Sequence, residues 1–252
     1  SSVANPEVTL TSAKFSIRPR IAVTDLKLDG AYSNGFIVGQ NYTNLIKWSN
    51  TGTTITNVNI FYSTDGGGSF PGVIDNSGLT LVTAGATGVA WNVPDSVALV
   101  SNAQVRVVDT GNGSVLGDSV NFKLRGGLTL TAPASGVTWT ASSTNNIAWN
   151  FGGAITTVNV YYDLNDLDGD QWTTILPVSI KGQAGNSGAS TIEWAIPSTV
   201  TNNARIKIED AADATNTFDV GPLFNVGAQF DITAPENGVD VFAENTTTNI
   251  TW

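Results

Sequence analysis

The chain has 252 residues, of which only 13% are charged, and 11 basic residues stand against 21 acidic ones for a net charge of −10. It contains no Cys, His or Met, so disulfides, thiolate metal sites and the commonest general base are all excluded. The negative charge and the lack of a Lys/Arg cluster disfavour nucleic acid and anionic lipid as partners. No run of about 18 apolar residues occurs, so we expect no direct membrane insertion.

A pattern of about 100 residues recurs along the chain and predicts tandem modules. Its opening segment is found three times, and each copy ends in a tryptophan: Trp48, Trp149 and Trp252. The three copies are LKLDGAYSNGFIVGQNYTNLIKW at 26–48, LTLTAPASGVTWTASSTNNIAW at 128–149 and FDITAPENGVDVFAENTTTNITW at 230–252.

The middle and the end of the module repeat in the same order. The paired segments are VNIFY (58–62) with VNVYY (158–162), WNVP (91–94) with WAIP (194–197), and AQVRVVD (103–109) with ARIKIED (204–210). The module closes with NFKL around Phe122 and LFNV around Phe224, and KFSI around Phe15 shows the same closing pattern. We therefore expect four segments: 1–21, the C-terminal strand region of a truncated preceding repeat; 22–125 and 126–227, two complete modules; and 228–252, the opening strands of a truncated following repeat.

The local pattern predicts strands. Val58, Ile60 and Tyr62 alternate with other residues, as do Val105 and Val107, which is the period-two signature of a half-buried antiparallel strand. Turn residues recur every 8–12 residues or so, which is typical of sandwiches. About seven short strands per module predict an all-β chain of tandem immunoglobulin-like antiparallel β-sandwiches. The Trp residues at fixed repeat positions, which are Trp48, Trp91, Trp149 and Trp194, are expected in the cores.

The order LTLTAP, then IAW, VNVYY, WAIP, ARIKIED and a closing FNV resembles a known immunoglobulin-like module. That module is found at the amino terminus of Ser/Thr-rich, glycolipid-anchored fungal cell-wall proteins. It is repeated in bacterial surface-layer (S-layer) proteins, including those of anaerobic ammonium-oxidising bacteria. The resemblance implies secretion, an extracellular place at the cell surface, and a structural role. It supplies no catalytic residues.

Two hairpin sequences between strands carry the candidate chemistry. Ser63–Phe70 resembles the Asp-box hairpin of sialidase-type propellers, with Asp65 accepting hydrogen bonds from turn amides; we expect a tight turn, with sugar contact as the alternative. The second module has an acidic segment at the same place. Hard oxygen ligands on a turn suit Ca²⁺, and a solvated tip is the alternative. The candidate calcium ligands are Asp163, Asn165, Asp166, Asp168 and Asp170.

Other candidate sites concern glycans. N-x-[ST] sequons mark glycosylation candidates at Asn41, Asn112, Asn245 and Asn249. Trp139 and Trp172 have no Trp counterpart in the first module, so they are candidates for sugar contact.

The sequence predicts a structural, non-enzymatic cell-surface protein: part of a surface-layer or cell-wall-associated repeat array that forms a lattice or stalk. The expected partners are other copies of the chain, with cell-wall or surface glycans as a further possibility and calcium as the one cofactor considered. An adhesin or carbohydrate-binding module is the alternative function. No convergent pair of carboxylates, as a glycosidase needs, is recognisable.

Overall fold

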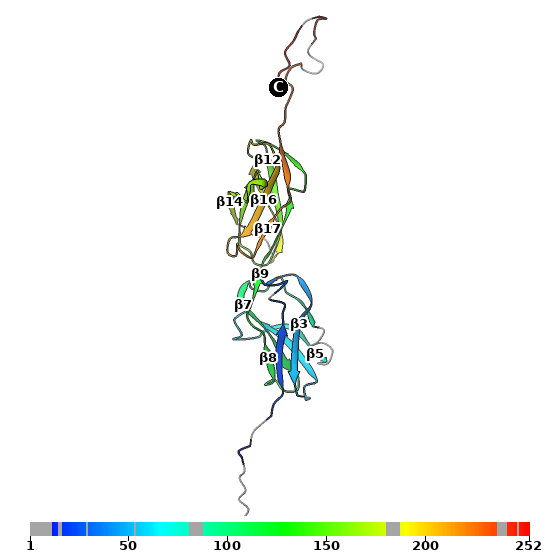
Figure 1. The fold of residues 1–252 in the computed structure, drawn as a ribbon, viewed down its shortest axis with the longest axis vertical. Helices are drawn as coiled ribbons and strands as arrows, with labels where there is room; N and C mark the ends of the chain where they lie inside the picture. Colours follow the sequence, from blue (N-terminus) through cyan, green and yellow to red (C-terminus); the bar gives the residue numbers. More distant parts are fainter. Residues whose placement is uncertain are drawn as a thin grey trace, which may run out of the picture. The chain divides into compact units, whose positions relative to one another are not determined.

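The computed structural model describes residues 12–14, 17–28, 30–52, 54–80, 88–179, 187–235, 241–245 and 247–252. Within these ranges the regular elements are β-strands and one short 3₁₀ helix (Figure 1). The chain is all-β, as its sequence predicts. No helix in the described ranges is long and apolar enough to cross a membrane.

The first sandwich has two sheets. Its strands are β1 (Arg20–Asp25), β2 (Phe36–Ile37), β3 (Asn41–Thr51), β4 (Asn57–Ser63), β5 (Gly72–Thr80), β6 (Val89–Asn92), β7 (Val100–Asp109), β8 (Leu116–Asp118) and β9 (Phe122–Arg125). One sheet has the order β1-β3-β6, and the other has β2-β9-β7-β4-β5, with β8 paired to β7.

The second sandwich repeats this arrangement strand for strand. Its elements are β10 (Gly127–Ala132), β11 (Thr138–Thr140), β12 (Thr144–Gly152), β13 (Thr157–Asp163), the 3₁₀ helix η1 (Asp166–Asp168), β14 (Thr173–Ser179), β15 (Ser187–Ala195), β16 (Thr201–Asp210), β17 (Phe218–Val220) and β18 (Phe224–Gly227). The sheets are β10-β12-β15 and β11-β18-β16-β13-β14, with β17 on β16. Identical strand order in both copies confirms tandem immunoglobulin-like sandwiches.

The chain divides into two compact units: Ser1–Ser33 with Tyr42–Trp91 and Asn102–Phe122, and Asn34–Asn41 with Asn92–Ser101 and Lys123–Trp252. The strand β1 begins at Arg20, two residues before the boundary expected at 22. Along the sequence, β9 ends at Arg125 and β10 begins at Gly127. The four segments expected from the sequence stay a prediction about domain organisation.

The first two strands of each sandwich belong to different sheets. In the first, β1 pairs antiparallel with β3 and β2 pairs parallel with β9, so that Phe36 lies opposite Leu124. In the second, β10 pairs with β12 and β11 pairs parallel with β18, so that Trp139 lies opposite Val226. Trp139 therefore occupies the repeat position of Phe36.

The cores lie between the two sheets of each sandwich. The rings of Trp48, Trp91, Trp149 and Trp194 are all buried, which confirms the prediction made from their fixed positions. The pairing of β4 with β7 and of β13 with β16 places small and branched apolar side chains at equivalent buried positions. These are Val58, Ile60, Ala103, Val105 and Val107 in the first sandwich and Val158, Val160, Ala204, Ile206 and Ile208 in the second.

Candidate functional site

The two tryptophans considered for sugar contact are not an open platform. Trp139 is only partly exposed and packs against the core of the second sandwich, with ring centroids 6.2 Å from Trp194 and 5.2 Å from Phe224. Its ring fills the core place that Phe36 fills in the first sandwich. Trp172, just before β14, is also partly buried. Neither ring is fully exposed, and sugar contact at Trp139 and Trp172 stays a prediction.

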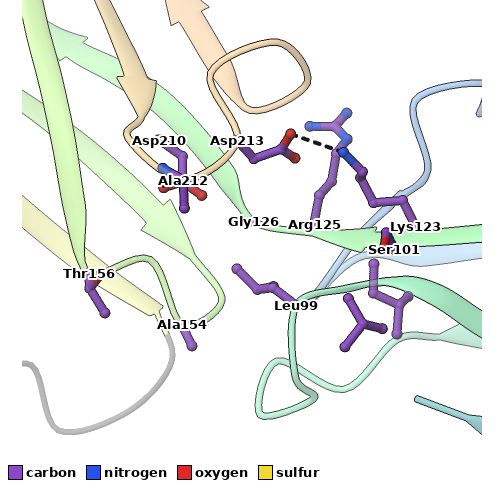
Figure 2. A pocket seen from close by; sticks show the side chains of 12 residues that line it. Leu99, Ser101, Lys123, Arg125, Gly126, Ala154, Thr156, Asp210, Ala212 and Asp213 are labelled. Atoms are coloured by element: carbon purple, nitrogen blue, oxygen red, sulfur yellow. Dashed lines mark hydrogen bonds and ion pairs between the residues drawn. The ribbon is translucent and has the colours of Figure 1, made fainter. Parts of the chain in front are cut away.

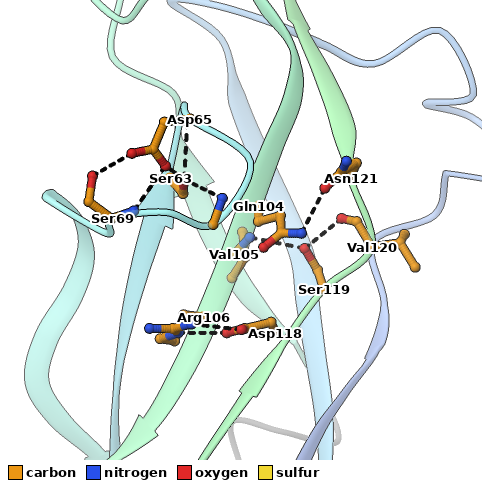
Figure 3. A network of polar contacts seen from close by, with 11 residues as sticks. Ser63, Asp65, Ser69, Gln104, Val105, Arg106, Asp118, Ser119, Val120 and Asn121 are labelled. Atoms are coloured by element: carbon orange, nitrogen blue, oxygen red, sulfur yellow. Dashed lines mark hydrogen bonds and ion pairs between the residues drawn. The ribbon is translucent and has the colours of Figure 1, made fainter.

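The hairpin after β4 is organised by hydrogen bonds within the turn (Figure 3). The buried Ser63 hydroxyl donates to Asp65 Oδ1 over 2.6 Å and accepts from the backbone N–H groups of Asp65 and Gly67. Asp65 also accepts from the backbone N–H and the hydroxyl of Ser69, at 3.0 and 2.7 Å. Gly67 has φ of +88°, a conformation that suits glycine. The residues of the Asp-box pattern thus build the turn.

The same hydrogen bonds set the charge state of Asp65. The Ser63 hydroxyl, followed by the backbone N–H and hydroxyl of Ser69, holds the pKa of the Asp65 carboxyl well below its usual range. Both carboxylate oxygens are occupied by donors from the turn itself. This arrangement supports the structural interpretation of the hairpin more than a contact with sugar.

In the acidic hairpin of the second sandwich, Asp163 occupies the place that Ser63 has in the hairpin of the first sandwich. Asp163 is the last residue of β13 and Ser63 is the last residue of β4, and both are buried. The Asp163 carboxylate accepts backbone N–H groups from Asn165, at 2.8 Å, and from Gln171, at 3.1 Å. The turn therefore engages both oxygens of Asp163.

The remaining candidate calcium ligands are dispersed. The carboxylate of Asp166, in η1, forms an ion pair with Arg205 at 3.2 Å, whereas Asn165, Asp168 and Asp170 are exposed. Among the described residues, no three acidic side chains come together in a way that could hold a metal ion. Calcium binding by this hairpin stays a prediction. Of its candidate ligands, Asn165, Asp168 and Asp170 have exposed side chains.

The larger sheet of the first sandwich carries a cation, an aromatic ring and a carboxylate in contact with one another. Arg106 pairs with Asp118 through two contacts, from Nε to Oδ1 at 2.6 Å and from Nη2 to Oδ2 at 2.7 Å (Figure 3). The guanidinium of Arg106 also lies 3.8 Å from the ring centroid of Phe70. Such bidentate and cation–π contacts hold side chains in one orientation. The Phe70 ring thereby ties the hairpin to the sheet.

The second sandwich has a comparable cluster. Glu209 Oε2 contacts Lys207 Nζ at 2.9 Å, and Glu209 Oε1 accepts from the Tyr161 hydroxyl at 2.8 Å and from Asn159 at 3.4 Å. Burial acts to raise the pKa of Glu209, but the hydrogen bonds from Lys207 and Tyr161 outweigh burial and lower it. The bond to Glu209 raises the pKa of Tyr161. An ionised, fully engaged carboxylate of this kind is suited to stabilising the sheet surface and poorly suited to acid catalysis.

A repeated buried aspartate, which sequence reasoning missed, closes the turn after β7 and β16. Asp109 Oδ1 accepts from the N–H of Gly111 at 3.1 Å, and Asp210 Oδ1 accepts from the N–H of Ala212 at 3.0 Å. The recurrence of Asp at the end of AQVRVVD and ARIKIED is the signal that could have found this pair. Its role is to satisfy backbone donors in the turn.

Asp210 also borders a pocket of about 300 Å³ in the second compact unit (Figure 2). Burial raises the pKa of Asp210. Burial also acts to raise that of Asp213, but hydrogen bonds from Asn216 and Lys123 lower it, and the Lys123 Nζ to Asp213 Oδ1 distance is 3.0 Å. Diverging pKa values in a pocket are one mark of acid–base sites. Here both carboxylates are occupied by turn amides and side-chain donors, as in the equivalent turn at Asp109, so the divergence has a structural cause.

The four sequon asparagines are all exposed. Asn41 begins β3, Asn112 lies in the β7–β8 turn, and Asn245 and Asn249 lie in the last described segments. Asn112 Oδ1 accepts from the backbone N–H and the hydroxyl of Ser114, at 3.1 and 2.7 Å. Exposure leaves every sequon accessible, and glycosylation stays a prediction.

Comparison with known proteins gives a distant likeness only. Neither a protein-family model nor a curated protein matches the sequence. Among solved structures, the chain is similar to the fibronectin(III)-like modules of Clostridium thermocellum CbhA, at 17% identity over 82% of this chain and 94% of that one, with a TM-score of 0.30. A superposition this loose carries no functional argument. The assignment of the fold rests on the repeated strand order.

Proposed function

We propose that this chain is a structural module of an extracellular surface array, such as a surface layer or a cell-wall-associated stalk, and that it works by association with other copies. The observation that carries this proposal is the strand-for-strand repetition of one sandwich with equivalent buried positions. Repeating one folded module lengthens a surface structure and introduces no new reactive side chains.

The chemistry of the carboxylates supports the same proposal. Asp65 and Asp163 organise hairpins, Asp109 and Asp210 close turns, and Glu209 anchors a surface cluster. In each case at least one carboxylate oxygen accepts a hydrogen bond from the same sandwich. Non-enzymatic function, extracellular location and surface glycans as partners belong to the proposal.

An assembly assay tests this function. The full chain should form extended or sheet-like assemblies when it is concentrated. Negative-stain electron microscopy would detect them, in one sample with calcium and one with a chelator. A panel of glycoside substrates should show no turnover, and a glycan array tests separately whether surface glycans are partners. Specific glycan binding by a protein that stays dispersed would favour the adhesin or carbohydrate-binding alternative, and turnover of any substrate would refute the proposal.

A further inference from the structure

The strand β15 (Ser187–Ala195) forms one edge of its sheet. It is the last strand in the order β10-β12-β15, so within that sheet only β12 pairs with it. All nine of its residues pair with β12 in one unbroken antiparallel register. An edge strand of this kind presents backbone N–H and C=O groups that can pair with a strand of another molecule. Proteins usually prevent such pairing with short strands, bulges, Pro or Lys at the edge.

The other edge strands that the structure describes are short or irregular. The strands β2, β6, β8, β11 and β17 have two to four residues each. The strands β1, β5, β10 and β14 each have a register shift against the neighbouring strand, and β14 also contains Pro177. By contrast, β15 contains no Pro, Lys or Arg, and Glu193 is its one charged residue. Among the described edge strands, β15 is therefore the one that is both long and regular.

Alternate residues of β15 direct their backbone groups away from β12. Just beyond the strand, the N–H of Ile196 donates to the carbonyl oxygen of Ser143 at 2.8 Å. In an antiparallel pair the backbone groups of every second residue face the neighbouring strand. Counting back from Ile196, the residues that face outward near the end of β15 are Thr191, Glu193 and Ala195. No residue in the described part of the chain forms a hydrogen bond with the outward backbone groups of these three.

An apolar groove lies beside this part of the edge. Its volume is about 390 Å³, and its lining comes from β15 and from the facing sheet. The rings of Tyr162 and Trp194, with centroids 5.1 Å apart, are part of the lining, together with Ile175 of β14. Ile192, which is half-buried and packs against the core, is the residue of β15 next to this groove-lining segment. A strand added to β15 would therefore place its own inward side chains against apolar groups.

A second copy of the chain is the occupant that this edge fits. The edge can pair with its own counterpart antiparallel about a two-fold axis, and this covers both edges at once. The chain carries a net charge of −10, so two copies repel each other. Because β15 carries a single charged side chain, that of Glu193, repulsion between copies is weakest where few charges meet. A near-neutral edge is suited to close approach of two acidic molecules.

The positions of the outward backbone groups limit the register of such a pair. Thr191 of one copy can lie opposite Thr191, Glu193 or Ala195 of the other, which centres the register on Thr191, Ile192 or Glu193. The first register would use Ala189, which already has an interaction of its own. The third would place two Glu193 carboxylates opposite each other, which is destabilising. The register centred on Ile192 avoids both costs.

We propose that β15 of one copy adds antiparallel to β15 of a second copy, in the register centred on Ile192. Thr191 of each copy then lies opposite Glu193 of the other and exchanges backbone hydrogen bonds with it, and the two Ile192 side chains meet at the two-fold axis. The contact is isologous, so by itself it joins two copies. The inference rests on the proposed function, because it names one contact through which copies associate.

The size and charge of the contact set its expected strength. It involves far fewer than the roughly 20–30 residues a side of a standard interface. Backbone hydrogen bonds supply the affinity, and the apolar Ile192 pair fixes the register. Salt should strengthen the contact by screening the repulsion between two copies of net charge −10. We therefore expect a weak dimer whose population rises with protein and salt concentration.

Cysteine cross-linking tests the register directly, because the chain has no Cys of its own. In full-length Ile192→Cys the two thiols would meet at the two-fold axis. The Cα atoms of a non-hydrogen-bonded antiparallel pair lie about 4.5 Å apart, within the range that a disulfide accepts. Ser190→Cys is the matched control, since Ser190 is half-buried like Ile192 and lies on the same side of the strand. In the proposed register its two thiols would be offset by four residues, about 14 Å.

Under mild oxidation the Ile192→Cys dimer should form several-fold faster than the Ser190→Cys dimer. Equal rates for the two variants would overturn the register. An extended peptide of unrelated sequence with one Cys is the probe for a different occupant. If it cross-links to Ile192→Cys as fast as a second copy does, the edge accepts strands in general and the self-pairing is wrong.

A proline substitution separates this contact from the broader proposal. Thr191→Pro removes an outward N–H but no hydrogen bond to β12, since Pro is tolerated on an edge strand where its nitrogen faces solvent. Thr191→Val keeps the N–H and is the matched control, and the urea midpoint shows that both variants are folded. Thr191→Pro should abolish the dimer in light scattering and in Ile192→Cys cross-linking, whereas Thr191→Val should retain it. Dimer formation through β15 that survives Thr191→Pro would refute this contact but leave the structural function standing. A chain that stays monomeric at every concentration and salt level would refute both.

Discussion

Trp149 and Trp252 occupy the same position in the repeat, but replacing each by Ala should lower the free energy of unfolding by very different amounts. Trp149 is completely buried, and replacing a buried Trp by Ala costs about 3–5 kcal/mol through lost burial and the cavity left behind. A domain of this size has a total stability of about 5–15 kcal/mol. At about 4–8 °C per kcal/mol for a domain of up to 100 residues, Trp149→Ala should lower the melting temperature of the second sandwich by at least roughly 12 °C.

Trp252→Ala is the matched control, because Trp252 has the same repeat position but is 75% exposed. Its cost should stay within about 0.5 kcal/mol, as for ordinary surface positions. The indole nitrogen of Trp149 has no hydrogen-bond partner among the described residues, so Trp149→Phe should cost less than Trp149→Ala.

Amide exchange followed by peptide mass spectrometry, in dilute protein, resolves the two sandwiches. Trp149→Ala should speed exchange in β10 to β18 and leave β1 to β9 at the wild-type rate. Equal effects of Trp149→Ala and Trp252→Ala would contradict the core position of Trp149.

Three further predictions concern charge. Hydrogen bonds lower the pKa of Asp65. Its carboxylate therefore stabilises the fold above about pH 4, and this contribution is lost as the pH falls through the folded-state pKa. The difference in urea midpoint between wild type and Asp65→Asn should shrink on acidification. Burial raises the pKa of Asp210. Asp210→Asn, which keeps an acceptor for the Ala212 N–H, should therefore be at least as stable as wild type at pH 7, and wild type should gain stability relative to the variant as the pH falls. A variant that unfolds at a lower urea concentration than wild type at pH 7 would contradict this. If calcium binds the acidic hairpin, it should raise the melting temperature of wild type but not of a double variant with Asp168→Asn and Asp170→Asn, whereas identical melting with calcium and with chelator would exclude the site.

The fold was predictable because the repeat constrains it twice. Alternation at Val58, Ile60 and Tyr62 predicted a strand, and its return as VNVYY at the same offset showed that the pattern belongs to a module. The recurring tryptophans then predicted the cores. Each of these signals depends on local periodicity and on spacing, both of which are visible in one sequence.

The candidate sites were harder to predict, because a carboxylate in a sequence does not show what it contacts. Asp163 reads as one of several acidic residues in a turn, but its position at the end of β13 buries it and directs both oxygens to turn amides. In the sequence Trp139 is an aromatic residue without a Trp counterpart in the first module. In the structure it lies in β11, which pairs with β18, and its ring packs against the core. The Arg106 contacts with Asp118 and Phe70 join three separate segments, and only the folded sheet brings them together.

Sedimentation velocity on the intact chain, from micromolar to near-millimolar concentration at low and high salt, tests the central claim most directly. We expect a sedimentation coefficient that rises with protein concentration as copies of the chain associate. A single monomeric boundary under all conditions would contradict a structural module that works by association with its own copies.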